Sequence, residues 1–267
     1  MGKAGKLSRA RYFWIAAGLL LSIMAGVGIS SGVQENATAD EAVNLSAGFS
    51  YLTLRDYRMD PEHPPLGKMQ NAIPLLFLKP HLPTEDANWA SGDEYPFGNK
   101  FLYENRVPAE ELLFSARAIT ILITLLLGIQ IAVLTRAYFG VNAALFAVLL
   151  FCFEPTILAH SRYVTNDVLI SLCILSACGC WATCVEERSG RSLIFTGLTV
   201  GAALSSKFSG VLVFPMMGAM YVLVSVVARA KRAGVSEASA FVVLKLCEGD
   251  VDHCSDCIRR DLDRLRL

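Results

Sequence analysis

The sequence predicts an all-α integral membrane protein with about six transmembrane helices and a long first loop outside the membrane. Of its 267 residues, 54% are hydrophobic and 18% are charged, and the mean hydropathy is +0.45. These values are too apolar for an ordinary soluble domain. Lysine plus arginine and aspartate plus glutamate both number 24, so no excess of positive charge points to nucleic acid as a partner.

Apolar runs of the length needed to cross a bilayer, about 20 residues, recur along the chain, and the fifth is the shortest. The expected helices are 13–33, 113–135, 141–159, 168–185, 192–206 and 208–228. Basic residues precede the first run, so residues 1–12 are expected in the cytoplasm. Lysine or arginine also lies at every later end of a span that this orientation places in the cytoplasm. A cleaved signal peptide shares this pattern, but its apolar core is usually about 7 to 15 residues long. The longer run here favours a retained anchor.

Residues 34–112 form the only long loop between these runs, and they are expected on the outer side. The loop carries thirteen acidic and six basic residues and no cysteine, so no disulfide framework is implied. Five of the chain's eight cysteines fall in the expected spans, where cysteine behaves as a small apolar residue.

The first element of the loop is a helix over residues 38–54, TADEAVNLSAGFSYLTL, whose apolar residues recur at helical spacing. Such a helix would suit the membrane surface. Thr38 followed by Glu41 fits a capping box, which gives Glu41 a structural explanation. Asp40 has no comparable role beyond favouring the positive end of the helix dipole. An acid at the membrane surface could take a proton from an incoming hydroxyl as a general base.

The second element follows DPEHPPLGK, residues 60–68. Its proline pair disfavours helix up to Pro65, and a second surface helix is expected to begin at Leu66. Lys68 could balance the charge of a phosphate, while Glu62 and His63 could steer protons or bind a divalent metal. The alternative is an interfacial turn whose charged residues only stay hydrated.

Two more polar corners are expected on the same face. FEPTILAHSRYVTNDV, residues 153–168, brings Arg162 and Asp167 to the start of the fourth span, although Asp167 also suits a helix N-cap. SSKFSG, residues 205–210, carries Lys207, which could instead only snorkel to the interface. Three corners at one face predict a polar pocket at the lipid boundary.

In this order, ADEAVNLSAGFSYL, EHPPLGKMQNAIPLL, LAHSRYVTNDVLISL and GAALSSKFSGVLVFP resemble segments of the bacterial membrane glycosyltransferases related to protein O-mannosyltransferases and aminoarabinose transferases. These proteins form glycosyltransferase family 39 and its relatives and share the multi-spanning GT-C fold. The resemblance extends over about residues 10–230. It implies that a sugar is transferred from a polyprenyl-phosphate donor, which lies among the membrane lipids, to an acceptor that is a lipid, a glycan or a protein. The transfer usually inverts the configuration at the anomeric carbon. The active site would face outward from a bacterial plasma membrane.

The resemblance also implies roles for acids of the loop and the second corner. Asp40 matches the acidic position proposed as catalytic base, and Glu41 is its neighbour. Asp167 matches the acid of the second outer loop. All three are therefore expected in or beside the catalytic centre.

The donor phosphate is expected at the remaining polar residues. Glu62 and His63 match the pair before the double proline, a region that shapes the donor-phosphate site and in some relatives binds a metal. Lys68, Arg162 and Lys207 are candidates for stabilising the leaving phosphate, because electrostatic stabilisation is central to such transfers.

The resemblance divides the chain into a transferase-like domain, 13–233, and a tail, 234–267, that matches nothing expected of the family. Relatives are commonly longer, so a shortened or frameshifted gene product is the economical explanation of the tail. Its Cys254 and Cys257 form CxxC, with Cys247 and His253 nearby, and a zinc site is conceivable there. Two other functions stay open: an inactive remnant or assembly partner, and a component of a membrane transporter.

Overall fold

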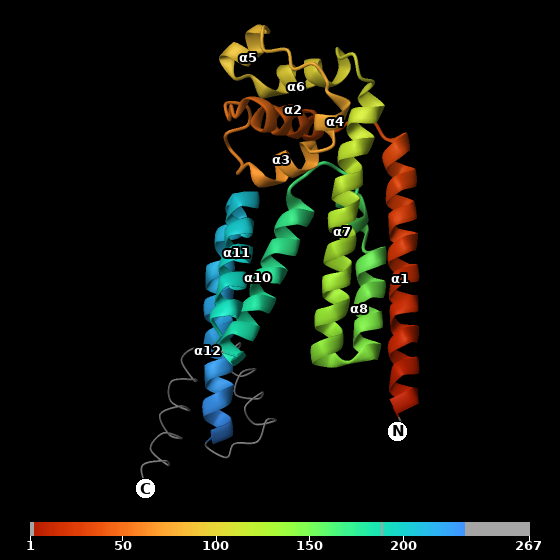
Figure 1. Cartoon of the computed structure of the whole chain (residues 1–267), viewed down its shortest axis with the longest axis vertical. Helices are drawn as coiled ribbons and strands as arrows, with labels where there is room; N and C mark the ends of the chain where they lie inside the picture. The colour runs from red at the N-terminus through yellow and green to blue at the C-terminus, as the bar shows by residue number, and fades with distance from the viewer. Residues whose placement is uncertain (1–2, 188, 233–267) are drawn as a thin grey trace. The chain divides into compact units, whose positions relative to one another are not determined.

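The computed structural model describes residues 3–187 and 189–232. The chain divides into two compact units, Met1–Val213 and Phe214–Leu267. The described residues form helices and no strands (Figure 1). The helices are α1 (Lys3–Gln34), α2 (Ala39–Leu54), α3 (Leu66–Ala72), α4 (Leu75–Leu78), α5 (Ala87–Ser91), α6 (Glu94–Tyr103), α7 (Ala109–Phe139), α8 (Val141–Phe153), α9 (Pro155–His160), α10 (Asp167–Glu187), α11 (Gly190–Ser206), the 3-10 helix η1 (Phe208–Leu212) and α12 (Val213–Arg232).

Four helical segments of the described chain are long and apolar enough to cross a membrane. They are Arg11–Gln34, Ala109–Phe139, Asp167–Val185 and Phe208–Val226. The all-α membrane fold class is thereby confirmed, and these segments correspond to the first, second, fourth and sixth predicted spans.

The third and fifth predicted spans are not among these four segments. The third is broken at Glu154, because Pro155 has no N–H and the Glu154 carboxylate accepts the Ile157 N–H at 2.6 Å, which starts α9. The α8 segment left before the break has 13 residues, or roughly 20 Å at about 1.5 Å per residue. The fifth, α11, has 17 residues. α8 is too short to span a bilayer core of about 30 Å, and α11 lies at the lower limit of the range, about 17 residues.

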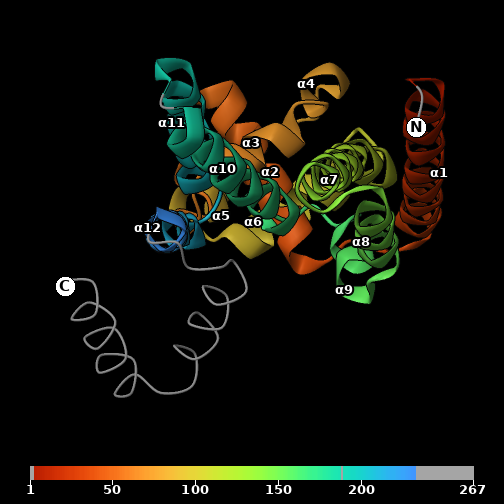
Figure 2. The same ribbon diagram turned by 90° about the horizontal axis from the view of Figure 1, so that it is seen from below.

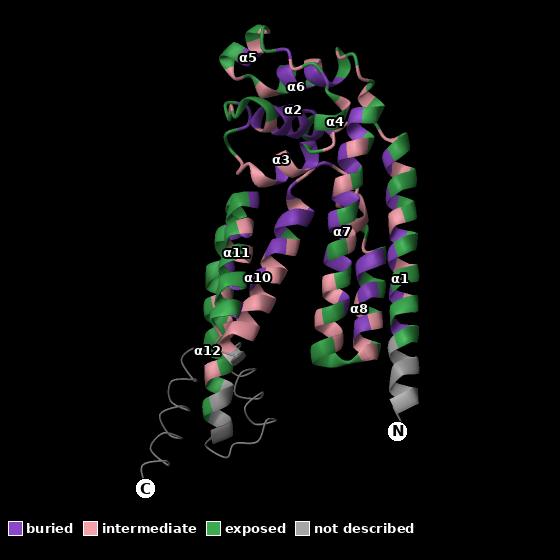
Figure 3. Cartoon of the chain, viewed as in Figure 1, coloured by how far each residue is buried: buried purple, intermediate pink, exposed green. Residues whose placement is uncertain are grey.

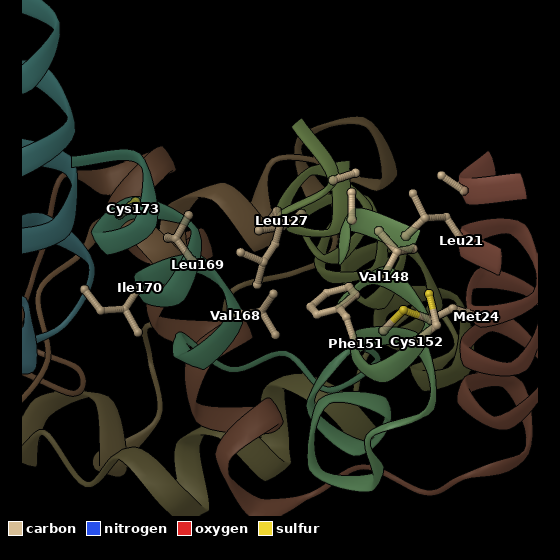
Figure 4. Packing of buried hydrophobic residues seen from close by; sticks show 14 of the residues in the cluster. Leu21, Met24, Leu127, Val148, Phe151, Cys152, Val168, Leu169, Ile170 and Cys173 are labelled. Carbon is tan, nitrogen blue, oxygen red and sulfur yellow. The ribbon is translucent and has the colours of Figure 1, made fainter. Parts of the chain in front are cut away.

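Within the first unit, the spans form two groups. α7 packs against α1 and α8, α10 packs against α11, and contacts between α7 and α10 join the groups. Figure 2, seen from below, separates the two groups clearly. A shared core of aliphatic and aromatic side chains lies between α1, α7, α8 and α10, as Figure 4 shows for Leu21, Leu127, Phe151 and Val168.

A layer made of α2, α3, α5 and α6 lies at one end of these spans (Figure 1). α2 is the centre of the layer, since every residue from Glu41 to Tyr51 is buried (Figure 3). α3 and α6 cover it, so α2 is enclosed by the other loop helices. Gly48 allows this packing, because a Cβ there would lie 2.2 Å from the backbone oxygen of Lys68.

Candidate functional site

A cavity of about 140 Å³ is lined by residues of α2 and α6, the corner before α3, the start of α10 and the end of α11. We call it the polar cavity, because carboxylates, amides and hydroxyls make up most of its wall. Its lining residues are Asp40, Val43, Asn44, Asp60, Glu62, His63, Glu94, Tyr95, Thr165, Asn166, Asp167 and Lys207. Three corners that are far apart in the sequence therefore meet at one site.

Five of the eight residues predicted for the site line this cavity: Asp40, Glu62, His63, Asp167 and Lys207. The other three, Glu41, Lys68 and Arg162, are bound to other side chains and are not among its lining residues. The predicted roles of these three residues stay predictions, and the contacts of each are described below.

Asp40 lies in the first turn of α2 with an exposed side chain. Within the described part of the chain it makes no ion pair and no side-chain hydrogen bond. Its negative charge is the main reason that the pKa of the Tyr95 phenol, across the cavity, is raised above its usual value. A carboxylate with open lone pairs can accept a proton from a bound hydroxyl.

Glu41, the next residue, is completely buried. Its carboxylate accepts two hydrogen bonds from the Arg117 guanidinium, at 2.8 and 2.7 Å. It also closes the predicted capping box, because its Oε2 accepts the Thr38 N–H at 2.9 Å. The capping prediction is confirmed, and Glu41 acts as a structural anchor that has no free lone pair facing a substrate.

Helix α2 also fixes the position of the segment before α10. Glu41 accepts the N–H of Val164 at 3.1 Å, and Asn44 donates to its carbonyl at 2.9 Å. The backbone N–H and C=O of Val164, three residues before Asp167, are therefore both bound by side chains of α2. Gly67 of α3 packs on the same segment, since a Cβ there would meet Asn166 Oδ1 at 2.1 Å. This packing places Asn166 and Asp167 beside the loop layer.

Asp167 lies between two basic side chains. Its Oδ1 accepts from Lys207 Nζ at 2.6 Å, and its Oδ2 lies 3.4 Å from His160 Nδ1. The side chains of Asp167 and Lys207 are 40% and 32% exposed, so the pair stays accessible to a ligand. Among the described residues that line the cavity, Lys207 is the one lysine or arginine.

A buried lysine fixes the conformation of the segment before α3, residues 60–65. Lys68 is fully buried, and its Nζ forms an ion pair with Asp60 at 2.7 Å and donates to the backbone oxygens of Asp60 and His63. Burial lowers the pKa of Lys68, an effect that the Asp60 carboxylate partly offsets. The Tyr51 hydroxyl donates to the Met59 carbonyl and accepts from Lys68. Lys68 therefore fixes the corner's shape, and Glu62 and His63 project from it.

Arg162 points to the end of α1. Its guanidinium donates two hydrogen bonds of 2.8 Å to Glu35, and hydrogen bonding to Arg162 is the main cause that lowers the pKa of Glu35. Glu154, an acid within the third predicted span, caps α9 and lies at the break between α8 and α9. Neither residue offers a free charge along a span.

Sequence reasoning did not select Asp60, Glu94, Tyr95 and Asn166 as site residues. Asp60 belongs to the DPEHPP stretch, where the double proline predicted a fixed corner of the chain and could have drawn attention to this residue. Glu94 begins α6 with no local pattern that marks it; burial and the nearby Asp60 carboxylate raise its pKa. Asn166 is 7% exposed, and its Oδ1 has no hydrogen-bond partner.

No group of three or more His, Cys, Asp or Glu within residues 3–187 and 189–232 is arranged to hold a metal ion. Glu62 and His63 therefore stay predicted metal ligands only. The tail residues Cys247, His253, Cys254 and Cys257 lie outside the described residues.

Comparison with known proteins identifies the family to which the chain belongs. The model of the dolichyl-phosphate-mannose-protein mannosyltransferase family matches residues 109–247, just over half of the chain. The match includes the corners of Asp167 and Lys207, whereas the loop motifs around Asp40 and Glu62 lie before its first residue. Searches of curated proteins and of solved structures return no match. On the strength of the family match and the membrane-spanning helices, the chain belongs to the dolichyl-phosphate-mannose-protein mannosyltransferase family, which is an integral membrane family of the GT-C type.

Proposed function

We propose that this chain transfers a sugar from a polyprenyl-phosphate donor to an acceptor hydroxyl at the extracytoplasmic face, with the polar cavity as its reaction centre. Membership of the family implies glycosyl transfer that depends on a polyprenyl-phosphate-linked sugar. The observation that carries the rest is the meeting of an unpaired carboxylate, Asp40, and an accessible lysine, Lys207, on one cavity wall.

Asp40 is the proposed general base. It takes the proton of the acceptor hydroxyl while that oxygen attacks the anomeric carbon of the sugar. The bond from that carbon to the phosphate oxygen breaks, and its electron pair leaves with the polyprenyl phosphate. Attack on the side opposite the leaving group inverts the configuration at the anomeric carbon.

Lys207 is the proposed partner of the leaving phosphate. The Asp40, Glu62 and Glu94 carboxylates make the loop side of the cavity acidic, so the phosphate is expected near Lys207. Asp167 orients the Lys207 ammonium through its 2.6 Å contact. In this assignment Asp167 acts through Lys207 and is a positioning residue.

Replacement of the base tests the proposal. Asp40→Asn keeps the size and polarity of the side chain but removes its ability to take a proton. Transfer of labelled sugar from polyprenyl-phosphate donors by the full chain in proteoliposomes should fall about 100-fold or more.

Asp93→Asn is the matched control, because Asp93 is also an exposed loop acid next to a helix start and does not line the cavity. It should transfer sugar at the rate of the unmodified chain. A near-normal rate for Asp40→Asn would remove Asp40 as the base.

A further inference from the structure

Asn166, the residue before α10, is a buried amide on the wall of the polar cavity. It is 7% exposed and lines the cavity beside Asp167. Its backbone carbonyl accepts the Ile170 N–H at 3.0 Å, so it occupies the N-cap position, where an asparagine side chain usually accepts a backbone N–H of the first turn. Its Oδ1 makes no such bond and has no hydrogen-bond partner among the described residues. The amide therefore does not serve as a helix cap.

An unpaired amide at this position is unfavourable for the fold. A buried polar atom without a partner loses the hydrogen bonds that water would give it, and folded proteins contain few such atoms. Asn44, the other amide of the cavity wall, shows the usual arrangement, because its Nδ2 donates to the Val164 carbonyl at 2.9 Å. A cavity-lining amide that the fold leaves unsatisfied indicates that its partner is a ligand.

The position of Asn166 is fixed from two sides. Val164, two residues earlier, is bound through both of its backbone polar groups by Glu41 and Asn44. Gly67 of α3 lies against the amide, since a Cβ there would be 2.1 Å from Oδ1. Oδ1 is enclosed by this contact, so the Nδ2 end is the part of the amide that a ligand in the cavity can reach.

A hydroxyl is the ligand group that matches this amide. The ionised carboxylates of Asp40, Glu62 and Glu94 on the cavity wall can only accept hydrogen bonds. A sugar hydroxyl can donate to one of them and accept from Nδ2 at the same time. If the amide turns by 180°, Oδ1 takes the place of Nδ2, and a hydroxyl can still donate to it. A phosphate oxygen, which only accepts, cannot pair with the amide in both orientations.

We propose that the side-chain amide of Asn166 binds a ring hydroxyl of the donor sugar and thereby selects the sugar. The proposal rests on the function proposed above and adds a residue that discriminates between sugars. Asn166 is next to Asp167, whose partner Lys207 is assigned to the phosphate, so the hydroxyl belongs to the ring attached to that phosphate. A sugar without this hydroxyl would leave the buried amide unpaired and would be rejected.

Binding of lipids with and without a sugar tests the contact. The probes are undecaprenyl phosphate and undecaprenyl phosphate that carries mannose, glucose or galactose. The measurement is equilibrium binding to the purified full chain in detergent. The unmodified chain should bind at least one sugar-bearing lipid about tenfold more tightly than undecaprenyl phosphate. Asn166→Ala should abolish this difference and leave the affinity for undecaprenyl phosphate unchanged.

Two other amides provide matched controls. Asn99→Ala removes an exposed amide of α6 that does not line the cavity, and it should retain the difference. Asn44→Ala removes a paired amide and should lower the midpoint of thermal unfolding of the ligand-free chain by about 2 °C or more. Asn166→Ala breaks no hydrogen bond of its side chain and should keep the midpoint within about 1 °C. Asn166→Leu keeps the branched shape and repeats the test with the contact to Gly67 filled.

Three binding results would overturn the proposal: the sugar-dependent difference persists in both Asn166 variants, undecaprenyl phosphate loses affinity equally, or the unmodified chain prefers no sugar-bearing lipid. A fall in the unfolding midpoint of both Asn166 variants as large as that of Asn44→Ala would also overturn it, because the amide would then be structural.

Sugar transfer in proteoliposomes separates this proposal from the proposed function. If the unmodified chain transfers no sugar but its preference for a sugar-bearing lipid disappears in Asn166→Ala, the function fails and the sugar contact stands. If the chain transfers sugar and Asn166→Ala keeps both the rate and the preference, the sugar contact alone fails.

Discussion

Asp40 and Glu41 are neighbours in the sequence with opposite environments. Successive residues of a helix point about 100° apart, so one carboxylate faces the polar cavity and the other faces the interior. Arg117, which binds Glu41, also donates to the carbonyls of Gly32 and Glu35 at the end of α1. One buried ion pair thus ties α1, α2 and α7 together, whereas the Asp40 carboxylate lies on the wall of the polar cavity.

Glu41→Ala should destabilise the chain by about 3–5 kcal/mol, because it leaves the Arg117 charge buried without its partner. Asp40→Asn should change the free energy of unfolding by less than about 0.5 kcal/mol, as expected for a surface position. Unfolding by denaturant in detergent measures both. Equal stability of the two variants would contradict the assignment of separate roles.

The ion pair of Glu35 and Arg162 predicts a dependence of stability on pH. The pKa of Glu35 is lowered in the folded chain by the Arg162 contact, so this carboxylate stabilises the fold above its unfolded pKa, and the stabilisation is lost as the pH falls through its folded pKa. Because its side chain is 33% exposed, the contribution should be about 1 kcal/mol or less.

Glu35→Gln should therefore flatten the loss of stability between about pH 5 and pH 3 and lower stability slightly at neutral pH. Thermal unfolding across this pH range measures the slope. Glu110→Gln alters another acid of the loop, and Arg162 pairs with Glu35 and not with Glu110, so this variant should leave the slope as it is. An unaltered slope in Glu35→Gln would contradict the stabilising role of the pair.

At the scale of elements, α3 positions the corner DPEHPPLGK, and α3 itself is positioned by its packing against α2. The close approach of α2 and α3 depends on Gly48, which lies against the Lys68 backbone. Because Lys68 in turn binds the carbonyls of Asp60 and His63, a shift of α3 would move Glu62 and His63 within the polar cavity.

Gly48→Ala should destabilise the chain by about 1–3 kcal/mol, the usual effect of overpacking against a backbone that cannot move away. Gly18→Ala is the control, because a Cβ at Gly18 of α1 meets nothing within 4 Å. Its free energy of unfolding should change by less than about 0.5 kcal/mol. Similar thermal shifts for both variants would show that the two helices do not approach closely at Gly48.

Sequence patterns predicted elements that depend on local signals. The capping box at Thr38 marked the start of α2, and the double proline marked the start of α3 at Leu66. The break at Glu154 was missed, because a continuous apolar run hides a change of direction that depends on Pro155 and one capping hydrogen bond.

Long-range ion pairs explain why two of the predicted site residues, Glu41 and Arg162, do not line the polar cavity. Glu41 and Arg117 are 76 residues apart, and Arg162 and Glu35 are 127 apart. No local sequence pattern indicates that such a distant ion-pair partner exists. A charged residue at a corner is therefore predicted to be available to bind a ligand. Asp40, Asp167 and Lys207 line one cavity, which agrees with the expectation that the three corners converge at one face; their roles stay predictions.

At the scale of the whole molecule, the proposed orientation places the loop 34–112 outside and the turn between α7 and α8 in the cytoplasm. In a chain whose native cysteines are replaced by alanine, Asp93→Cys should react with a membrane-impermeant maleimide on intact cells. Asn142→Cys, at an exposed position in the first turn of α8, should react only after the membrane is opened. The reverse pattern of labelling would place the polar cavity in the cytoplasm.

The central claim is that the polar cavity is where the sugar leaves its lipid phosphate. Its most direct test is the rate of donor cleavage and transfer by proteoliposomes that contain Lys207→Gln, compared with Lys79→Gln, an exposed lysine that does not line the cavity. The rate should fall about 100-fold for Lys207→Gln, as for other groups that stabilise developing negative charge, and stay unchanged for Lys79→Gln. Equal rates for the two variants would contradict the claim.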